Sequence, residues 1–99
     1  MAEFAHVLNT LVIDYMRRTS KSKAEIAQEC GYSASMFSHL LAGRREPGSR
    51  QAIFALGRAL ELHSEGINQL LAARGFSPIT KDEEKVHLVG AAAFQQRIA

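Results

Sequence analysis

The amino-acid sequence predicts an all-α protein on three observations. Apolar residues recur every three or four positions through most of the chain, which is typical of helices with one buried face. No segment shows the strict apolar–polar alternation of a half-buried strand. Both prolines, Pro47 and Pro78, stand beside turn-forming residues and leave the segments between them free to be helical. The length of 99 residues and the apolar content of 46% fit one globular domain.

The first helix is expected from Phe4 to about Arg18. Its apolar residues fall at three- and four-residue steps and would form one buried face. They are Phe4, Val7, Leu8, Leu11, Val12 and Tyr15.

Two short helices should follow in close succession. Ser22 and Glu25 have the spacing of a capping box, in which each side chain bonds to the other residue's backbone N–H, so a helix is expected to begin here. Gly31 can adopt the left-handed conformation that ends a helix. Ser33 is a suitable N-cap for the next helix, and Gly43 would end it.

Ser49 and Ser64 are expected to cap a fourth and a fifth helix, with Gly75 ending the fifth. Thr80 and Glu83 form another possible capping box, so a sixth helix is expected over about residues 81–97.

Composition excludes several classes of protein. Cys30 is the single cysteine, so no internal disulfide can form, and we expect a cytoplasmic protein with neither a secretory signal nor a membrane span. The histidines stand apart and no carboxylates are paired for acid–base work, so we expect neither an enzyme, a metal site nor a cofactor.

Positive charge is concentrated in the middle of the chain. The net charge of +2 divides into −2 for residues 1–16, +5 for residues 17–58 and −1 for residues 59–99. A basic patch beside a nearly neutral remainder favours a polyanionic partner.

The stretch with the most information about function runs from residue 22 to residue 47. It reads Ser22-Lys-Ala-Glu-Ile-Ala-Gln-Glu-Cys-Gly-Tyr-Ser-Ala-Ser-Met-Phe-Ser-His-Leu-Leu-Ala-Gly-Arg-Arg-Glu-Pro47. This stretch resembles the Cro and lambda-repressor-like (XRE-type) helix-turn-helix DNA-binding family, and the resemblance extends over roughly residues 6–76. It implies a five-helix DNA-binding domain at residues 1–78, with the helix-turn-helix at about 22–43. Two departures are Lys21, where the family has an apolar residue, and an additional C-terminal helix within residues 79–99.

The resemblance assigns base reading to the start and middle of the third helix, and we add Arg45, in the loop after it, as a further candidate. The residues concerned are Ala34, Ser35, Ser38, His39 and Arg45. None of the four helix residues makes the bidentate contact of arginine with guanine or glutamine with adenine, so specificity can also depend on Arg45 and on DNA shape.

Phosphate contacts are expected from helix N-termini and from the basic loop, which begins with Arg44 and Arg45 after the third helix. The residues assigned to them are Lys23, Ser33, Arg44 and Arg50. The alternative for the charged members of this set is that they are solvated surface charges.

The C-terminal extension is expected to supply a dimer interface, because its apolar residues have no evident partner in the five preceding helices. They are Val86, Val89, Phe94 and Ile98. The alternative is that this segment folds back and completes the core of its own domain.

Together these expectations describe a transcriptional regulator that binds double-stranded DNA as a homodimer, with repression as the simplest output. The antitoxin of a toxin–antitoxin pair, with the toxin as a second partner, is a close variant. The same features also fit a protein-interaction module that keeps the fold without binding DNA, or a protein that compacts DNA with low specificity.

Overall fold

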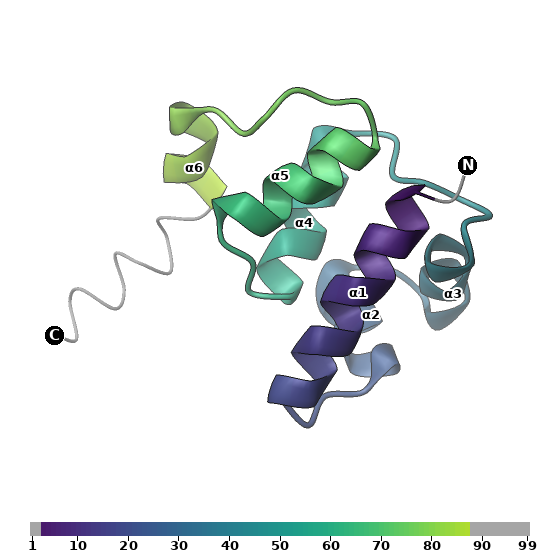
Figure 1. Ribbon diagram of the computed structural model, residues 1–99. Coiled ribbons are helices and arrows are strands. Elements are labelled where there is room, and N and C mark those ends of the chain that lie inside the picture. Colours follow the sequence, from purple (N-terminus) through teal and green to yellow (C-terminus); the bar gives the residue numbers. More distant parts are fainter. Residues whose placement is uncertain (1–2, 88–99) are drawn as a thin grey trace, which may run out of the picture.

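A computed structural model describes residues 3–87, and the described part of the chain contains six helices and no strand (Figure 1). The prediction of an all-α fold is therefore confirmed. The helices are α1 (Glu3–Arg18), α2 (Lys23–Cys30), α3 (Ala34–Ala42), α4 (Arg50–Ala59), α5 (Ser64–Ala73) and α6 (Lys81–His87).

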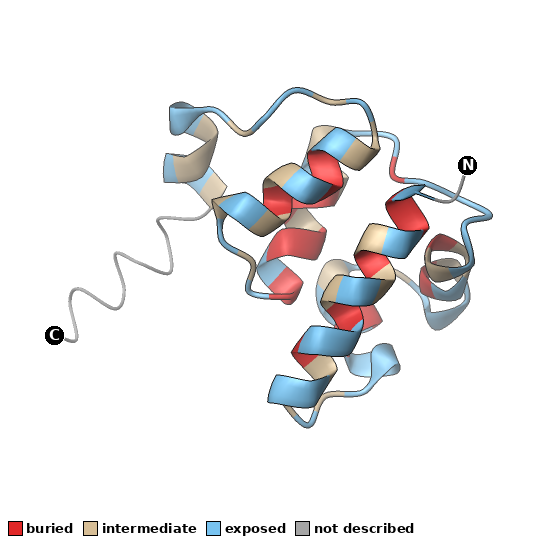
Figure 2. Cartoon of the chain, viewed as in Figure 1, coloured by how far each residue is buried: buried red, intermediate tan, exposed pale blue. Residues whose placement is uncertain are grey.

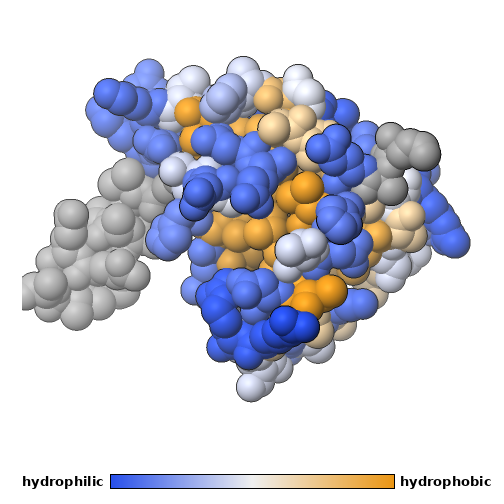
Figure 3. Space-filling model, in the orientation of Figure 1, coloured by the Kyte–Doolittle hydropathy of each residue, from blue (hydrophilic) through white to orange (hydrophobic). Residues whose placement is uncertain are grey.

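One hydrophobic core joins the first five helices, and their buried faces turn toward it (Figure 2). Helix α1 packs against α3 and α5, α2 packs against α3 and α4, and α4 packs against α5. The largest fully buried side chains include Tyr15, Phe4, Phe37 and Phe54. In the view of Figure 3, apolar side chains also reach the surface in a strip between α1 and α5, with hydrophilic side chains around it.

Local signals set the ends of α2 and α3. Ser22 and Glu25 form the expected capping box, and the hydroxyl of Ser33 accepts a hydrogen bond from Met36 N. Gly31 and Gly43 end the two helices in the left-handed conformation, at φ 84° and 80°, where a Cβ would be strained. Only residues 31–33 separate the two helices.

The turn between α4 and α5 differs from the sequence-based expectation. His63, rather than Ser64, is the N-cap of α5, and its side chain makes no capping hydrogen bond. Glu61 takes a left-handed backbone conformation, at φ 55°, and Leu62 N donates to Gly57 O, which closes the end of α4. The first backbone hydrogen bond of α5 runs from Ile67 N to His63 O, so the helix begins directly after this tight turn.

Helix α6 begins at the predicted capping box. Thr80 N donates to Glu83 Oε1, and Glu83 N donates to Thr80 Oγ1. The helix is described as far as His87, so the rest of the expected segment 81–97 lies outside the described residues. Its last residue packs on α4, where the rings of His87 and Phe54 stack with their centroids 4.3 Å apart.

Between residues 3 and 87 we find no helix that combines the length and the apolar character needed to cross a membrane.

Candidate nucleic-acid interface

Helix α3 has one face in the core and an opposite face of small residues, two of which are polar. Phe37 and Leu40 are buried, 2% exposed each. The opposite side carries Ala34, Ser35 and Ser38, which are all exposed. The structure therefore brings together three of the four helix residues predicted to read bases, on a face that nothing in residues 3–87 covers.

His39, the fourth of these residues, is half-buried. Its Nδ1 is buried and has no hydrogen-bond partner among the described residues. An unsatisfied buried N–H is rarer in proteins than an under-satisfied acceptor, which favours the tautomer with the proton on Nε2. In that tautomer His39 offers a single donor, which suits an acceptor on a base edge.

Two exposed arginines follow directly after α3. Arg44 and Arg45 are exposed, and neither forms an ion pair within residues 3–87. Their backbone N–H groups donate to His39 O, at 2.9 Å and 3.4 Å, so the loop begins in a fixed position at the end of the helix. Both guanidinium groups are available to an anionic ligand.

Arg74, at the end of α5, holds the other side of the same loop. Its Nε donates to Pro47 O at 2.8 Å, and its Nη1 lies 3.5 Å from a carboxylate oxygen of Glu46. Pro47 itself is buried. The loop between α3 and α4 is therefore anchored at both ends, and sequence analysis did not identify Arg74 because its partners lie 27 residues away or more.

The other two predicted phosphate ligands in this region are also accessible. Lys23 is the first residue of α2, is exposed and forms no ion pair within the described part of the chain. Ser33 is exposed, although its hydroxyl already accepts from Met36 N. A ligand would therefore meet the free N–H groups of the first turn of α3 rather than an unoccupied serine oxygen.

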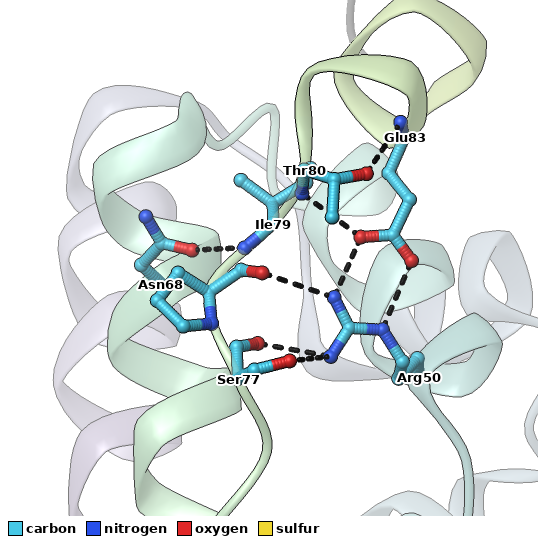
Figure 4. A network of polar contacts seen from close by, with 7 residues as sticks. Arg50, Asn68, Ser77, Ile79, Thr80 and Glu83 are labelled. Atoms are coloured by element: carbon cyan, nitrogen blue, oxygen red, sulfur yellow. Dashed lines mark hydrogen bonds and ion pairs between the residues drawn. The ribbon is translucent and has the colours of Figure 1, made fainter.

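Arg50, the remaining predicted phosphate ligand, differs from the others because its guanidinium is already bound within the chain. Its guanidinium is bound to Glu83 through two hydrogen bonds, Nε to Oε2 at 2.9 Å and Nη2 to Oε1 at 2.6 Å (Figure 4). It also donates to Ser77 O, Ser77 Oγ and Pro78 O. The Arg50 guanidinium, together with the hydrogen bond from Thr80 N, lowers the pKa of Glu83 to about 2. With its donors used within the chain, Arg50 fastens α6 and the segment before it to α4.

The predicted dimer residues are only partly described. Val86 is 73% exposed on α6, whereas Val89, Phe94 and Ile98 lie outside the described residues. The first part of the extension, up to His87, folds back on α4, which agrees with the alternative considered for this segment.

Asn9 is a further residue of this region that sequence analysis missed. Its side chain reaches from α1 to the last turn of α3, where Nδ2 donates to Leu41 O at 2.8 Å. No local pattern marks this residue, because its partner Leu41 lies 32 residues further along the chain.

Comparison with family models, with curated proteins and with solved structures finds no match to this chain. Within residues 3–87 no group of three or more histidine, cysteine or acidic side chains is arranged to hold a metal ion.

Proposed function

We propose that this chain is a sequence-specific DNA-binding regulator with the five-helix, lambda-repressor-like arrangement of a helix-turn-helix domain. The observation that carries the proposal is α3 itself. It is short, capped at both ends, anchored by Phe37 and Leu40, uncovered on its opposite face and followed by two unpaired arginines. These are the properties a helix needs to enter a major groove from a stable body.

Base edges and phosphates would be contacted by different parts of this surface. Ser35, Ser38 and His39 offer hydrogen-bonding groups to base edges, and Ala34 offers a methyl group for contact with thymine. Arg44, Lys23 and the N-terminus of α3 provide positive charge for phosphates. Arg45, in the loop directly after α3, would contact either a phosphate or a base edge. Of the basic residues in the middle of the chain, Arg18 and Lys21 are paired with acidic side chains, so the loop arginines and Lys23 are the better candidates.

We further propose that the protein acts as a homodimer in the cytoplasm and represses transcription by occupying a partly palindromic operator. Two subunits related by a twofold axis present α3 twice on one side of the duplex. An antitoxin that also holds a toxin is compatible with the same surface.

A protein-interaction module without DNA binding is the second candidate. The observation that favours it is the small, weakly discriminating set of side chains on the outer face of α3, which lacks arginine and glutamine.

The experiment that separates the two candidates is a pair of double substitutions. Arg44→Ala with Arg45→Ala should weaken binding to operator and to unrelated duplex alike and make the dependence of affinity on salt shallower, because fewer counterions are released. Lys81→Ala with Lys85→Ala removes the same charge from exposed positions of α6 and is the matched control. Fluorescence anisotropy over a range of salt concentrations measures the affinity of each double variant for both duplexes. Equal effects of the two pairs, or no binding by the parent protein, would refute the proposed interface.

A further inference from the structure

The side-chain amide of Asn9 joins two helices. Asn9 lies on α1, and its Nδ2 donates to Ala5 O, one turn earlier on the same helix, at 2.7 Å. The same nitrogen donates to Leu41 O on α3 at 2.8 Å. Both partners are carbonyl oxygens, so only the amide nitrogen can face them, and the orientation of the side chain is fixed by chemistry.

The contact falls at the point where α3 lacks backbone partners. The last carbonyl groups of a helix have no N–H of their own helix to accept from. His39 O and Leu40 O accept from the backbone N–H groups of residues 43–45, whereas Leu41 O accepts from Asn9. Asn9 thus supplies a hydrogen bond that the helix end requires and places its donor on the neighbouring helix.

This geometry ties the angle of α3 to α1. Phe37 and Leu40 hold the inner face of α3 by apolar contacts, which tolerate small rotations because they are not directional. A hydrogen bond has a preferred distance and direction, so the bond to Leu41 O restricts movement of the C-terminal half of α3. That half carries His39 and leads into Arg44 and Arg45.

We propose that Asn9 is a positioning residue that holds α3 at the angle required for reading bases. The inference rests on the proposed function of α3. Hydrogen bonds to base edges need the reading groups to be held within about half an ångström, whereas attraction between arginine and phosphate tolerates larger displacements. Loss of the bond should therefore lower discrimination between DNA sequences more than it lowers affinity for DNA in general.

The test compares Asn9→Ala with Asn68→Ala. Asn68 is a matched control because it is also a half-buried helical asparagine with a side-chain bond to backbone, in its case from Ile79 N to Oδ1 at 2.8 Å, and it lies on α5. Both variants should melt at a lower temperature. Only Asn9→Ala should lower the ratio of affinities for a selected operator and an unrelated duplex, by at least about fivefold, with an unchanged salt dependence.

Asn9→Ser is the second variant, in case the alanine variant folds poorly. A serine hydroxyl can bond to the carbonyl one turn earlier but is too short to bridge to Leu41 O. It should lose discrimination as the alanine variant does. If the parent protein prefers no sequence, the proposed function fails. Suppose instead that the parent protein does discriminate between DNA sequences. The role of Asn9 is then refuted, and the proposed function stands, if Asn9→Ala or Asn9→Ser keeps the affinity ratio of the parent. It is refuted equally if Asn68→Ala lowers that ratio as much as Asn9→Ala does.

Discussion

Glu83 takes part in two interactions at once, the N-terminal cap of α6 and an ion pair with α4. Its carboxylate accepts from Thr80 N within the capping box of α6 and from the guanidinium of Arg50 on α4. These contacts favour the charged form of the carboxyl group, which lowers its pKa to about 2 from an ordinary value of 4.5. One side chain therefore both starts α6 and docks it.

Because of this double role, the free energy of unfolding should depend on pH in the acidic range. Because the pKa of Glu83 is lower in the folded protein than in the unfolded chain, its contribution is present above pH 4.5 and is lost as the pH falls toward 2. Glu83→Gln should therefore unfold at a lower temperature than the parent protein at pH 6, and the difference should vanish near pH 2. Thermal unfolding followed by circular dichroism from pH 2 to 6 provides the measurement.

Glu65→Gln is the control for this prediction, since Glu65 is exposed in the first turn of α5 and forms no ion pair within residues 3–87. It should keep the pH profile of the parent. A gap between the Glu83→Gln and parent melting temperatures that stays the same at pH 6 and pH 2 would contradict the assignment.

Contacts between distant residues limited what the sequence could predict at this scale. Arg50 lies beside the basic loop, and its position in the chain favoured a phosphate contact. Its partner Glu83 is 33 residues further along, and no local pattern links the two. The exposed face of α3 was predictable because the spacing of Phe37 and Leu40 determines which side of the helix is buried.

Helix boundaries were predictable where their signal lies within a few residues. Ser22, Ser33 and Ser49 cap their helices as expected, because a cap is a contact between residues three positions apart. The start of α5 was misplaced by one residue, since the turn before it depends on the left-handed conformation of Glu61. That residue is held from a distance by Tyr15, whose hydroxyl donates to Glu61 Oε2 at 3.0 Å.

The close contact between α4 and α5 depends on a glycine, Gly57, at the point where the helices meet. A Cβ added at Gly57 would lie 2.8 Å from Cδ1 and Cγ1 of Ile67, which is fully buried. Gly57→Ala should therefore lower the free energy of unfolding by about 1–3 kcal/mol, although alanine is the better helix former, because the two helices must separate or Ile67 must leave its rotamer. Urea unfolding measures the difference.

Gly48→Ala is the matched control for the helix contact. A Cβ at Gly48 would have no heavy atom within 4 Å, so this substitution should leave stability unchanged or raise it slightly. Gly57→Ala as stable as the parent would show that the close approach of α4 and α5 is not required.

At the scale of the whole molecule, the described part of the C-terminal extension packs against α4. Up to His87 it belongs to the domain, because Arg50 binds Glu83, and His87 covers Phe54 with its ring and lies 3.0 Å from Arg58 Nη1. The sequence could indicate that the extension is apolar. It could not indicate that the segment up to His87 packs on α4, since that depends on residues of α4.

Deleting residues 88–99 tests the proposed dimer interface without removing α6. The truncated protein should remain folded and should dissociate more readily, because Val89, Phe94 and Ile98 are absent from it. Deleting residues 79–99 should in addition lower the melting temperature, because it uncovers Phe54 and leaves Arg50 without Glu83. Sedimentation velocity and thermal unfolding measure both effects. A shorter truncation that stays dimeric at micromolar concentration would place the interface elsewhere.

Selection of bound duplexes from a random DNA pool is the most direct test of the proposed function. A symmetric dimer that places α3 of each subunit in successive major grooves should enrich a sequence repeated with opposite orientation, with half-site centres about one helical turn apart. Ser35→Ala and His39→Ala should change the preferred base at single positions of each half-site. Enrichment of no motif, or of one unrepeated half-site bound by single subunits, would contradict the proposal.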